Sequence, residues 1–207
     1  MSNKQVYSAG LLNRALDPAT QPPEIRAFLQ AEINLLRETA TSGMAVIDIG
    51  CGTGRHLVML AGQIRIGVGV DYEQAYLREA RTRAGAGRLY FVAADAARLP
   101  LRPVFDLAIC MTNSWGTMEQ KRAVVGEMRR CVLQPGMRLL SVFAEASVPA
   151  RHEWYRRLGH SVAEETAEYL RTDGGLRSEH FTEARLRSLI GDCTIRRCTE
   201  MGYVVNF

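Results

Sequence analysis

Three glycines at alternate positions, Gly50, Gly52 and Gly54, constrain the fold of this chain more than any other feature. They directly follow an apolar, β-branched run that is interrupted only by Asp48, and residues 55–61 behind them are expected to form a helix. Glycines lack a Cβ atom, so a ligand can lie directly on such a turn, and the start of the helix offers free N–H groups. The segment therefore predicts a ligand site at the carboxyl end of a buried strand.

The chain beyond this turn alternates between strand and helix patterns. Strands are expected at 44–49, 65–70, 89–93, 105–111 and 138–143, and helices at 73–83 and 118–131. Strands that alternate with helices pair in parallel through right-handed crossovers. We therefore predict an α/β fold with a doubly wound, mostly parallel sheet that carries helices on both faces. In this architecture, ligands bind at the carboxyl ends of the strands.

Polar side chains stand at or just beyond the ends of these expected strands, at Asp48, Asp71, Asp95 and Asn113. An acid after the second strand, such as Asp71, can accept hydrogen bonds from both ribose hydroxyls of an adenosine. A carboxylate that only caps the next helix is the competing interpretation for Asp71 and for Asp95. The order of the glycine turn and the two acids favours a nucleoside site.

An acidic residue followed by Gly-x-Gly-x-Gly resembles motif I of the class I S-adenosylmethionine-dependent methyltransferases. The resemblance covers residues 44–145 and implies a seven-stranded, Rossmann-like sheet whose last strand, at 202–207, is antiparallel. It implies S-adenosylmethionine as cofactor and S-adenosylhomocysteine as product, with Asp71 at the ribose and Asp95 at the adenine amino group. The residues that it implies at the cofactor are Asp48, Gly50, Cys51, Gly52, Gly54, Asp71, Tyr72, Asp95, Ala96 and Met111.

A nicotinamide dehydrogenase is the main rival, because it also uses a glycine-rich turn and an acid after the second strand. Three features count against it: Arg55 occupies the place of its third glycine, Asp48 precedes the turn, and 207 residues leave little room for a separate substrate domain. The pattern is also compatible with a cofactor-binding subunit without catalysis and with a methyltransferase that acts on protein or RNA.

The segment after the fourth expected strand, Asn113-Ser114-Trp115-Gly116, is the expected acceptor site. Methyl transfer gains most from holding the nucleophile in line with the methyl group, an effect of up to about 7–11 kcal/mol. We expect Asn113 to orient the acceptor as a catalytic residue, and Ser114 and Trp115 to contact it, although Trp115 could equally be a packing anchor. The segment resembles the Asn-Ser-Phe segment of glycine N-methyltransferase-like enzymes. It resembles the Asn-Pro-Pro-aromatic motif of nucleic-acid adenine methyltransferases only faintly.

Residues 146–181 interrupt the alternation, and the resemblance implies that they overhang the substrate. Asp173-Gly174-Gly175 predicts a hairpin turn within them. The substrate-binding residues expected there are Tyr169, Arg171 and Arg177, although exposed hairpin charges are a competing interpretation. His180 is a candidate general base for an oxygen acceptor, against a structural role in which it bonds a backbone group.

The 207 residues and the 47% hydrophobic content agree with one domain. We expect an N-terminal helical lid (1–43), a cofactor-binding core (44–145), a substrate-side insert (146–181) and a C-terminal helix with two strands (182–207). Five cysteines without a C-x-x-C pair predict reduced thiols, and the histidines and acids show no metal-ligand spacing.

The net charge of +4 comes almost entirely from dispersed arginines, so we do not expect a nucleic-acid partner. No apolar run approaches the length of a membrane span, and we expect a cytoplasmic protein without a membrane partner. The expected function is methylation of a small molecule. Nitrogen is slightly favoured because a neutral amine attacks unaided, whereas a hydroxyl usually needs a base. An O-methyltransferase of a small phenol or alcohol is the alternative.

Overall fold

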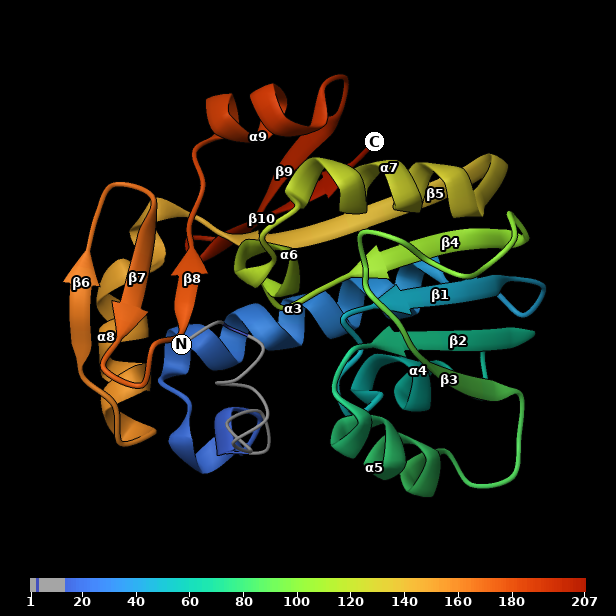
Figure 1. Cartoon of the computed structure of the whole chain (residues 1–207), viewed down its shortest axis with the longest axis horizontal. Coiled ribbons are helices and arrows are strands. Elements are labelled where there is room, and N and C mark those ends of the chain that lie inside the picture. Colours follow the sequence, from blue (N-terminus) through green and yellow to red (C-terminus); the bar gives the residue numbers. More distant parts are fainter. Residues whose placement is uncertain (1–2, 4–13) are drawn as a thin grey trace.

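A seven-stranded sheet forms the centre of the computed structural model, which describes residue 3 and residues 14–207 (Figure 1). Its strands are β1 (Ala45–Ile49), β2 (Ile66–Asp71), β3 (Leu89–Ala93), β4 (Phe105–Cys110), β5 (Val132–Phe143), β9 (Thr194–Thr199) and β10 (Gly202–Asn206). The strand order is β3-β2-β1-β4-β5-β10-β9. β10 is antiparallel to both of its neighbours, and the other pairs are parallel. The predicted fold class is therefore confirmed.

Strand β1 lies at the middle of this sheet, and all five of its residues are buried. Ala45, Ile47 and Ile49 pack toward one face, while Val46 packs toward the other, as the two-residue period of a strand requires. A strand that is covered on both faces has apolar residues at nearly every position, and this pattern is why the sequence predicts β1 well. The chain order reverses between β1 and β4, so the end of β1 is the point where ligands bind in such sheets.

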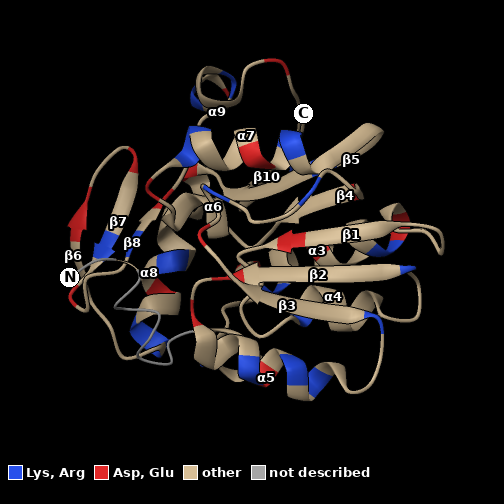
Figure 2. Cartoon of the chain, turned by 45° about the vertical axis from the view of Figure 1, so that its right-hand side comes forward, with Lys and Arg blue, Asp and Glu red and all other residues tan. Residues whose placement is uncertain are grey.

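Helices cover both faces of the sheet. The face toward which Val46 packs is covered by α3 (Pro23–Thr39), α4 (Arg55–Leu60) and α5 (Gln74–Ala84). The opposite face is covered by α7 (Lys121–Cys131) and α9 (Glu183–Ile190), and the short helix α6 (Ser114–Thr117) follows β4. Figure 2 shows the Lys and Arg residues distributed over α5, α7, α8 and α9, with acidic residues at the carboxyl ends of β1 and β2.

A second, three-stranded antiparallel sheet consists of β6 (Val162–Glu165), β7 (Tyr169–Thr172) and β8 (Arg177–Glu179). It lies beside α8 (Val148–Arg157), which follows the turn η2 (Glu145–Ser147) (Figure 1). The predicted hairpin between β7 and β8 is confirmed. Between β6 and β7 the Thr166 hydroxyl accepts the N–H groups of Glu168 and Tyr169, and the chain turns there.

The N-terminal part of the chain contains η1 (Pro18–Thr20) and α3. Residues 1–2 and 4–13 of the expected lid lie outside the described residues. Helix α3 begins at Pro23, where the fixed φ of proline suits the first turn, and its buried residues include Ile25, Phe28 and Leu36. None of the helices in the described part of the chain is long and apolar enough to cross a membrane.

Candidate cofactor and acceptor site

A pocket opens at the carboxyl ends of β1, β2, β3 and β4. The expected cofactor residues that line it are Gly50, Cys51, Gly52, Asp71, Tyr72, Asp95, Ala96 and Met111. Ser114, expected at the substrate, also lines it. Residues far apart in the chain therefore meet at one edge of the sheet, as parallel pairing requires.

The glycine turn adopts a left-handed backbone, with φ of 73° at Gly50, 52° at Gly52 and 75° at Gly54. A Cβ at Gly50 would lie 3.0 Å from both Met118 Cε and Ser114 Cβ, so a side chain there would crowd the wall of the pocket. A Cβ at Gly54 would lie 2.8 Å from Phe91 Cε1, which faces the core. Gly54 is therefore required for packing behind the turn, and it is not one of the residues that line the pocket.

Asp71 joins the end of β2 to the glycine turn. Its Oδ2 accepts the Gly52 N–H at 2.9 Å, and its Oδ1 accepts the Glu73 N–H at 2.9 Å. Burial raises the pKa of Asp71, and these two N–H groups partly oppose that rise because they stabilise the carboxylate. The side chain thus combines the two roles considered in the sequence: it faces the pocket, and it also caps the backbone that follows.

Asp95 and Ala96 lie beyond the end of β3. Asp95 Oδ1 accepts the Ala97 N–H at 2.9 Å, so the carboxylate also fixes the local backbone. Asp95, Ala96 and Ala97 all line the pocket on the side of β3. The site therefore presents a carboxylate and adjacent backbone groups at the end of β3.

Asp48 is buried at the end of β1, with 1% of its surface exposed. Its Oδ2 has no hydrogen-bond partner among the described residues, and it lies 3.5 Å from His56 Nδ1. His56 and its neighbour Arg55 line the pocket. Neither was identified in the sequence as a functional residue, although both follow the third glycine directly. Asp48 itself, although expected at the cofactor, is not among the residues that line the pocket, and its Oδ2 faces His56, which does line it.

Asn113 does not reach the pocket. Its Nδ2 donates to Ser178 Oγ at 3.1 Å and to the Glu179 carbonyl at 3.0 Å, and its Oδ1 accepts the Phe143 N–H at 3.1 Å. The side chain is buried and its amide is fully used in joining β5 to β8. The expectation that Asn113 orients the acceptor is therefore corrected: the residue has a structural role.

Trp115 is completely buried, and the expectation that it contacts the substrate is wrong. Its ring stacks on Phe181 with a centroid distance of 5.1 Å. The indole Nε1 donates to the Lys121 carbonyl at 3.0 Å. The packing interpretation of this residue is correct, because the first turn of α6 directs the indole into the core.

His180 is also buried away from the pocket, with 3% of its surface exposed. Its Nδ1 lies 3.2 Å from Arg151 Nη1. Burial lowers the pKa of His180, and the nearby Arg151 charge lowers it further. The structure therefore does not place His180 where a general base would act.

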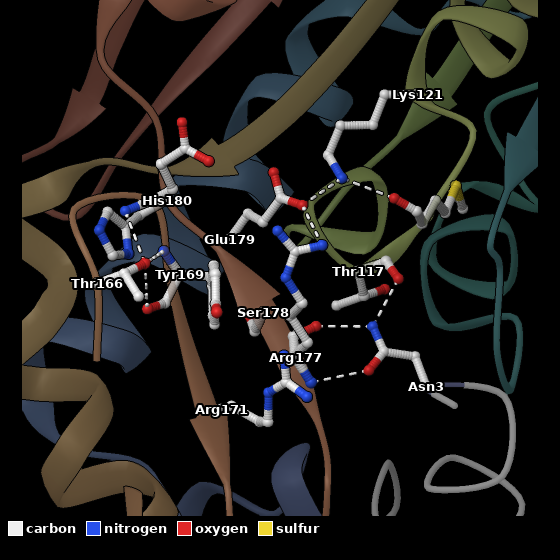
Figure 3. A network of polar contacts seen from close by, with 12 residues as sticks. Asn3, Thr117, Lys121, Thr166, Tyr169, Arg171, Arg177, Ser178, Glu179 and His180 are labelled. Atoms are coloured by element: carbon white, nitrogen blue, oxygen red, sulfur yellow. Dashed lines mark hydrogen bonds and ion pairs between the residues drawn. The ribbon is translucent and has the colours of Figure 1, made fainter. Parts of the chain in front are cut away.

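The other substrate-side candidates belong to the hairpin of the small sheet. The Tyr169 hydroxyl donates to Glu164 at 2.5 Å, and Arg171 pairs with Glu164 at 2.9 Å. Arg177 stacks over the Tyr169 ring and pairs with Glu179 at 3.3 Å (Figure 3). None of these three candidates lines the described pocket. Their contacts fit the competing interpretation, in which the charges of the hairpin pair with one another.

The sheet order, the antiparallel β10 and the glycine turn define a Rossmann-like methyltransferase fold. A methyltransferase domain family matches residues 46–136, which span β1 to the middle of β5. This part of the chain is similar to methyltransferase domains, and the described chain has the fold of the class I methyltransferases. The resemblance found in the sequence is therefore confirmed. Within the described residues, no group of three or more His, Cys, Asp or Glu side chains is arranged to hold a metal ion.

Two curated relatives are similar over part of their length. The O-methyltransferase resE of Aspergillus sclerotiorum is 31% identical over 72% of this chain and 61% of its own length. The O-methyltransferase cnsE of Penicillium expansum is 33% identical over 51% of this chain and 40% of its own. Among solved structures, the PH0226 protein of Pyrococcus horikoshii OT3 covers 90% of this chain and 92% of its own, with a TM-score of 0.67 and 19% identity. The chain thus spans only 40% to 61% of these two curated relatives.

Proposed function

We propose that this chain transfers a methyl group from S-adenosylmethionine to an oxygen atom of a small-molecule acceptor. The observation that carries the proposal is the convergence of the glycine turn, Asp71 and Asp95 on one pocket at the ends of three neighbouring strands. In this proposal, Asp71 holds the ribose hydroxyls, while Asp95 and the backbone of Ala96 hold the adenine ring.

The residues of the pocket fit this cofactor in two further respects. Gly50 leaves open a space next to Met118 and Ser114 that a Cβ would crowd. Arg55 supplies a cation in the pocket, and the buried Asp48 lies 3.5 Å from His56, which also lines it. A guanidinium suits the carboxylate group of an amino acid. We therefore assign the amino-acid end of the cofactor to the region of Arg55.

Oxygen replaces nitrogen as the proposed acceptor atom. The preference for nitrogen was based on the ability of a neutral amine to attack without a base, and an oxygen acceptor that is already ionised shares this ability. The relatives resE and cnsE are both named O-methyltransferases, which supports an oxygen acceptor. Asn113, which was expected to orient the acceptor, has its amide engaged away from the pocket.

The surroundings of His56 point to the kind of oxygen. His56 lines the pocket, but its Nε2 lies 2.9 Å from Arg55 Nη2 and its Nδ1 faces Asp48. One ring nitrogen is thus hydrogen-bonded and the other is directed at a buried carboxylate, while His180 is buried elsewhere. An acceptor that is ionised at neutral pH, such as a carboxylate or an acidic phenol, attacks without a base. We propose an acceptor of this class.

When bound, S-adenosylmethionine supplies an electrophilic methyl group on its sulfonium centre. The residues of this chain then act by position: they hold the adenosine at β2 and β3 and the amino acid near β1 and α4. This leaves the side of β4, lined by Met111, Thr112 and Ser114, for the acceptor. Alignment of this kind accounts for most of the acceleration available to methyl transfer.

A screen with cofactor labelled in the methyl group tests the proposed acceptor. Carboxylic acids, phenols and amines are offered separately, and each labelled product is identified by mass spectrometry. Methyl esters release their label as methanol in mild alkali, whereas methyl ethers and methylamines retain it. We expect label on an oxygen atom. Label found only on amines would overturn the assignment of oxygen and leave that of the cofactor standing.

Replacement of the acid after β2, Asp71→Ala, tests the assignment of the cofactor. Loss of a charged acceptor for two ribose hydroxyls should weaken S-adenosylhomocysteine binding by about 2–4 kcal/mol in calorimetry. The exposed Asp192→Ala variant is the control and should bind like the wild type. Because burial raises the pKa of Asp71, the wild-type affinity should decline on acidification at a higher pH than an ordinary aspartate would give. Unchanged affinity in Asp71→Ala would exclude it as the ribose ligand.

A further inference from the structure

Glu32 is a completely buried carboxylate on α3, outside the sequence motifs described above. Both of its oxygens are occupied. Oε1 accepts the Thr112 N–H at 2.7 Å and also the Ser141 hydroxyl. Oε2 accepts the Thr112 hydroxyl at 2.8 Å. A single acid of the N-terminal helix thus binds the ends of both β4 and β5.

Thr112, the main partner of Glu32, has an unusual backbone conformation. Its φ is 55° and that of the following Asn113 is 56°, so two consecutive residues other than glycine are left-handed. This conformation is rare for a β-branched residue such as threonine, and it persists only where surrounding contacts impose it. The bonds from Glu32 to the N–H and the hydroxyl of Thr112 are contacts of this kind. Since Thr112 lines the pocket, Glu32 shapes the wall without being part of it.

Arg55 completes this cluster from the side of the pocket. Its Nη2 donates to Thr112 Oγ1 at 2.9 Å and lies 3.7 Å from Glu32 Oε2. Glu32 therefore acts on Arg55 in two ways: by charge, and by orienting the hydroxyl that accepts the Arg55 bond. The Arg55 side chain is 23% exposed, so the guanidinium keeps access to the pocket.

The cluster lies at the opposite end of the pocket from the adenosine residues. Asp71 and Asp95 follow β2 and β3, whereas Thr112 follows β4 on the other side of β1. Asp48, with its unpartnered Oδ2, and His56 lie at the same end as Arg55. Arg55 and Thr112 are thus separated from Asp71 and Asp95, which follow β2 and β3 in the region proposed for adenosine.

We propose that Glu32 is a positioning residue that holds Arg55 and Thr112 for the amino-acid group of the cofactor. The inference rests on the proposed function, because it assigns that group to the end of the pocket near Arg55. Helix α3 lies outside the residues 46–136 that match the domain family. In this inference, α3 nevertheless determines which adenosine derivatives the pocket binds.

The isosteric variant Glu32→Gln tests this inference with two ligands. S-adenosylhomocysteine carries the amino-acid group, and 5′-methylthioadenosine carries the same adenosine and sulfur without it. The amide would keep one acceptor for the Thr112 N–H but would direct an NH₂ group toward Arg55. In calorimetry we expect about tenfold weaker binding of S-adenosylhomocysteine, which is the loss of one charged hydrogen bond, and unchanged binding of 5′-methylthioadenosine.

Glu38→Gln, an exposed acid on the same helix, is the matched control and should bind both ligands like the wild type. The double variant Glu32→Gln/Arg55→Gln should bind S-adenosylhomocysteine no more weakly than Arg55→Gln alone, because Glu32 acts through Arg55. Should Glu32→Gln fail to fold, Arg55→Gln alone must show the same selective loss.

The outcomes separate this inference from the proposed function. A wild-type chain that binds neither ligand would contradict the proposed function itself. A wild-type chain that binds both, together with variants that weaken both equally or neither, would overturn the role of Glu32 and leave the cofactor assignment intact.

Discussion

Gly50 and Gly54 belong to the same left-handed turn, yet their surroundings give them different tasks. Gly50 lines the pocket, whereas Gly54 lies against Phe91 in the core behind it. The alternate spacing of the glycines therefore combines a binding requirement with a packing requirement. The sequence motif alone assigns all three to the ligand, because a motif does not distinguish the two faces of a turn.

Gly54→Ala should destabilise the fold by about 1–3 kcal/mol. The new Cβ would lie 2.8 Å from Phe91 Cε1, and the backbone φ of 75° disfavours any L side chain. Gly62→Ala is the control, since the described residues leave its Cβ free of contacts within 4 Å. Urea unfolding of both variants measures the difference. Equal midpoints for Gly54→Ala and Gly62→Ala would contradict this account.

His180 should influence the pH dependence of stability and leave the rate of catalysis unchanged. Its pKa is lowered in the folded state, so below about pH 6.5 the unfolded chain binds a proton that the folded chain does not. The unfolding free energy of the wild type should therefore fall as the pH drops below that value. In His180→Ala, the unfolding free energy should depend less on pH. The control variant is His152→Ala, which removes an exposed histidine. Thermal unfolding between about pH 7.5 and pH 5 tests this. A large loss of kcat in His180→Ala would restore its role as a base.

At the level of elements, a buried ion pair joins α7 to the small sheet. Lys121 Nζ donates to Glu179 Oε1 at 2.8 Å and to the Met118 carbonyl, and both charged side chains are almost fully buried (Figure 3). Arg177 and Arg185 also contact Glu179. One carboxylate on β8 thus compensates three cations, and Met118 connects this arrangement to the wall of the pocket.

Glu179→Gln should cost about 3–5 kcal/mol of stability, because it leaves a buried Lys121 without its counter-charge. Glu164→Gln removes an exposed partner of Arg171 in the same small sheet and should cost less than about 1 kcal/mol. Chemical denaturation of the two variants gives the comparison. A similar loss of unfolding free energy in the two variants would contradict the prediction that the buried pair stabilises the fold more than the exposed pair.

At the level of the whole molecule, local patterns were sufficient to predict the large sheet. The apolar run of β1, the glycine turn and the alternation of strands and helices are properties of neighbouring residues, and they predicted the fold class, while the antiparallel last strand was implied by the family resemblance. The expected acids after β2 and β3 line the pocket for the same reason, since every parallel strand ends at one edge.

The acceptor side could not be predicted in this way. Whether Asn113 and Trp115 face the pocket or the core depends on β5, β8 and Phe181, which are distant in the sequence. Glu32 becomes important only because α3 packs where β4 and β5 end. Local spacing therefore identifies the residues at the ends of β1, β2 and β3. The directions of the side chains that follow β4 depend on long-range packing.

The side chain of Asn113 also affects how this molecule can fluctuate. Its amide bridges the Phe143 N–H of β5 and the Glu179 carbonyl of β8 in the buried interior. Separation of the two sheets would leave both of these groups unpaired, which is costly inside a protein. We therefore expect the small sheet and the end of β5 to open together, as one cooperative unit. Opening of the pocket is then expected elsewhere along its rim.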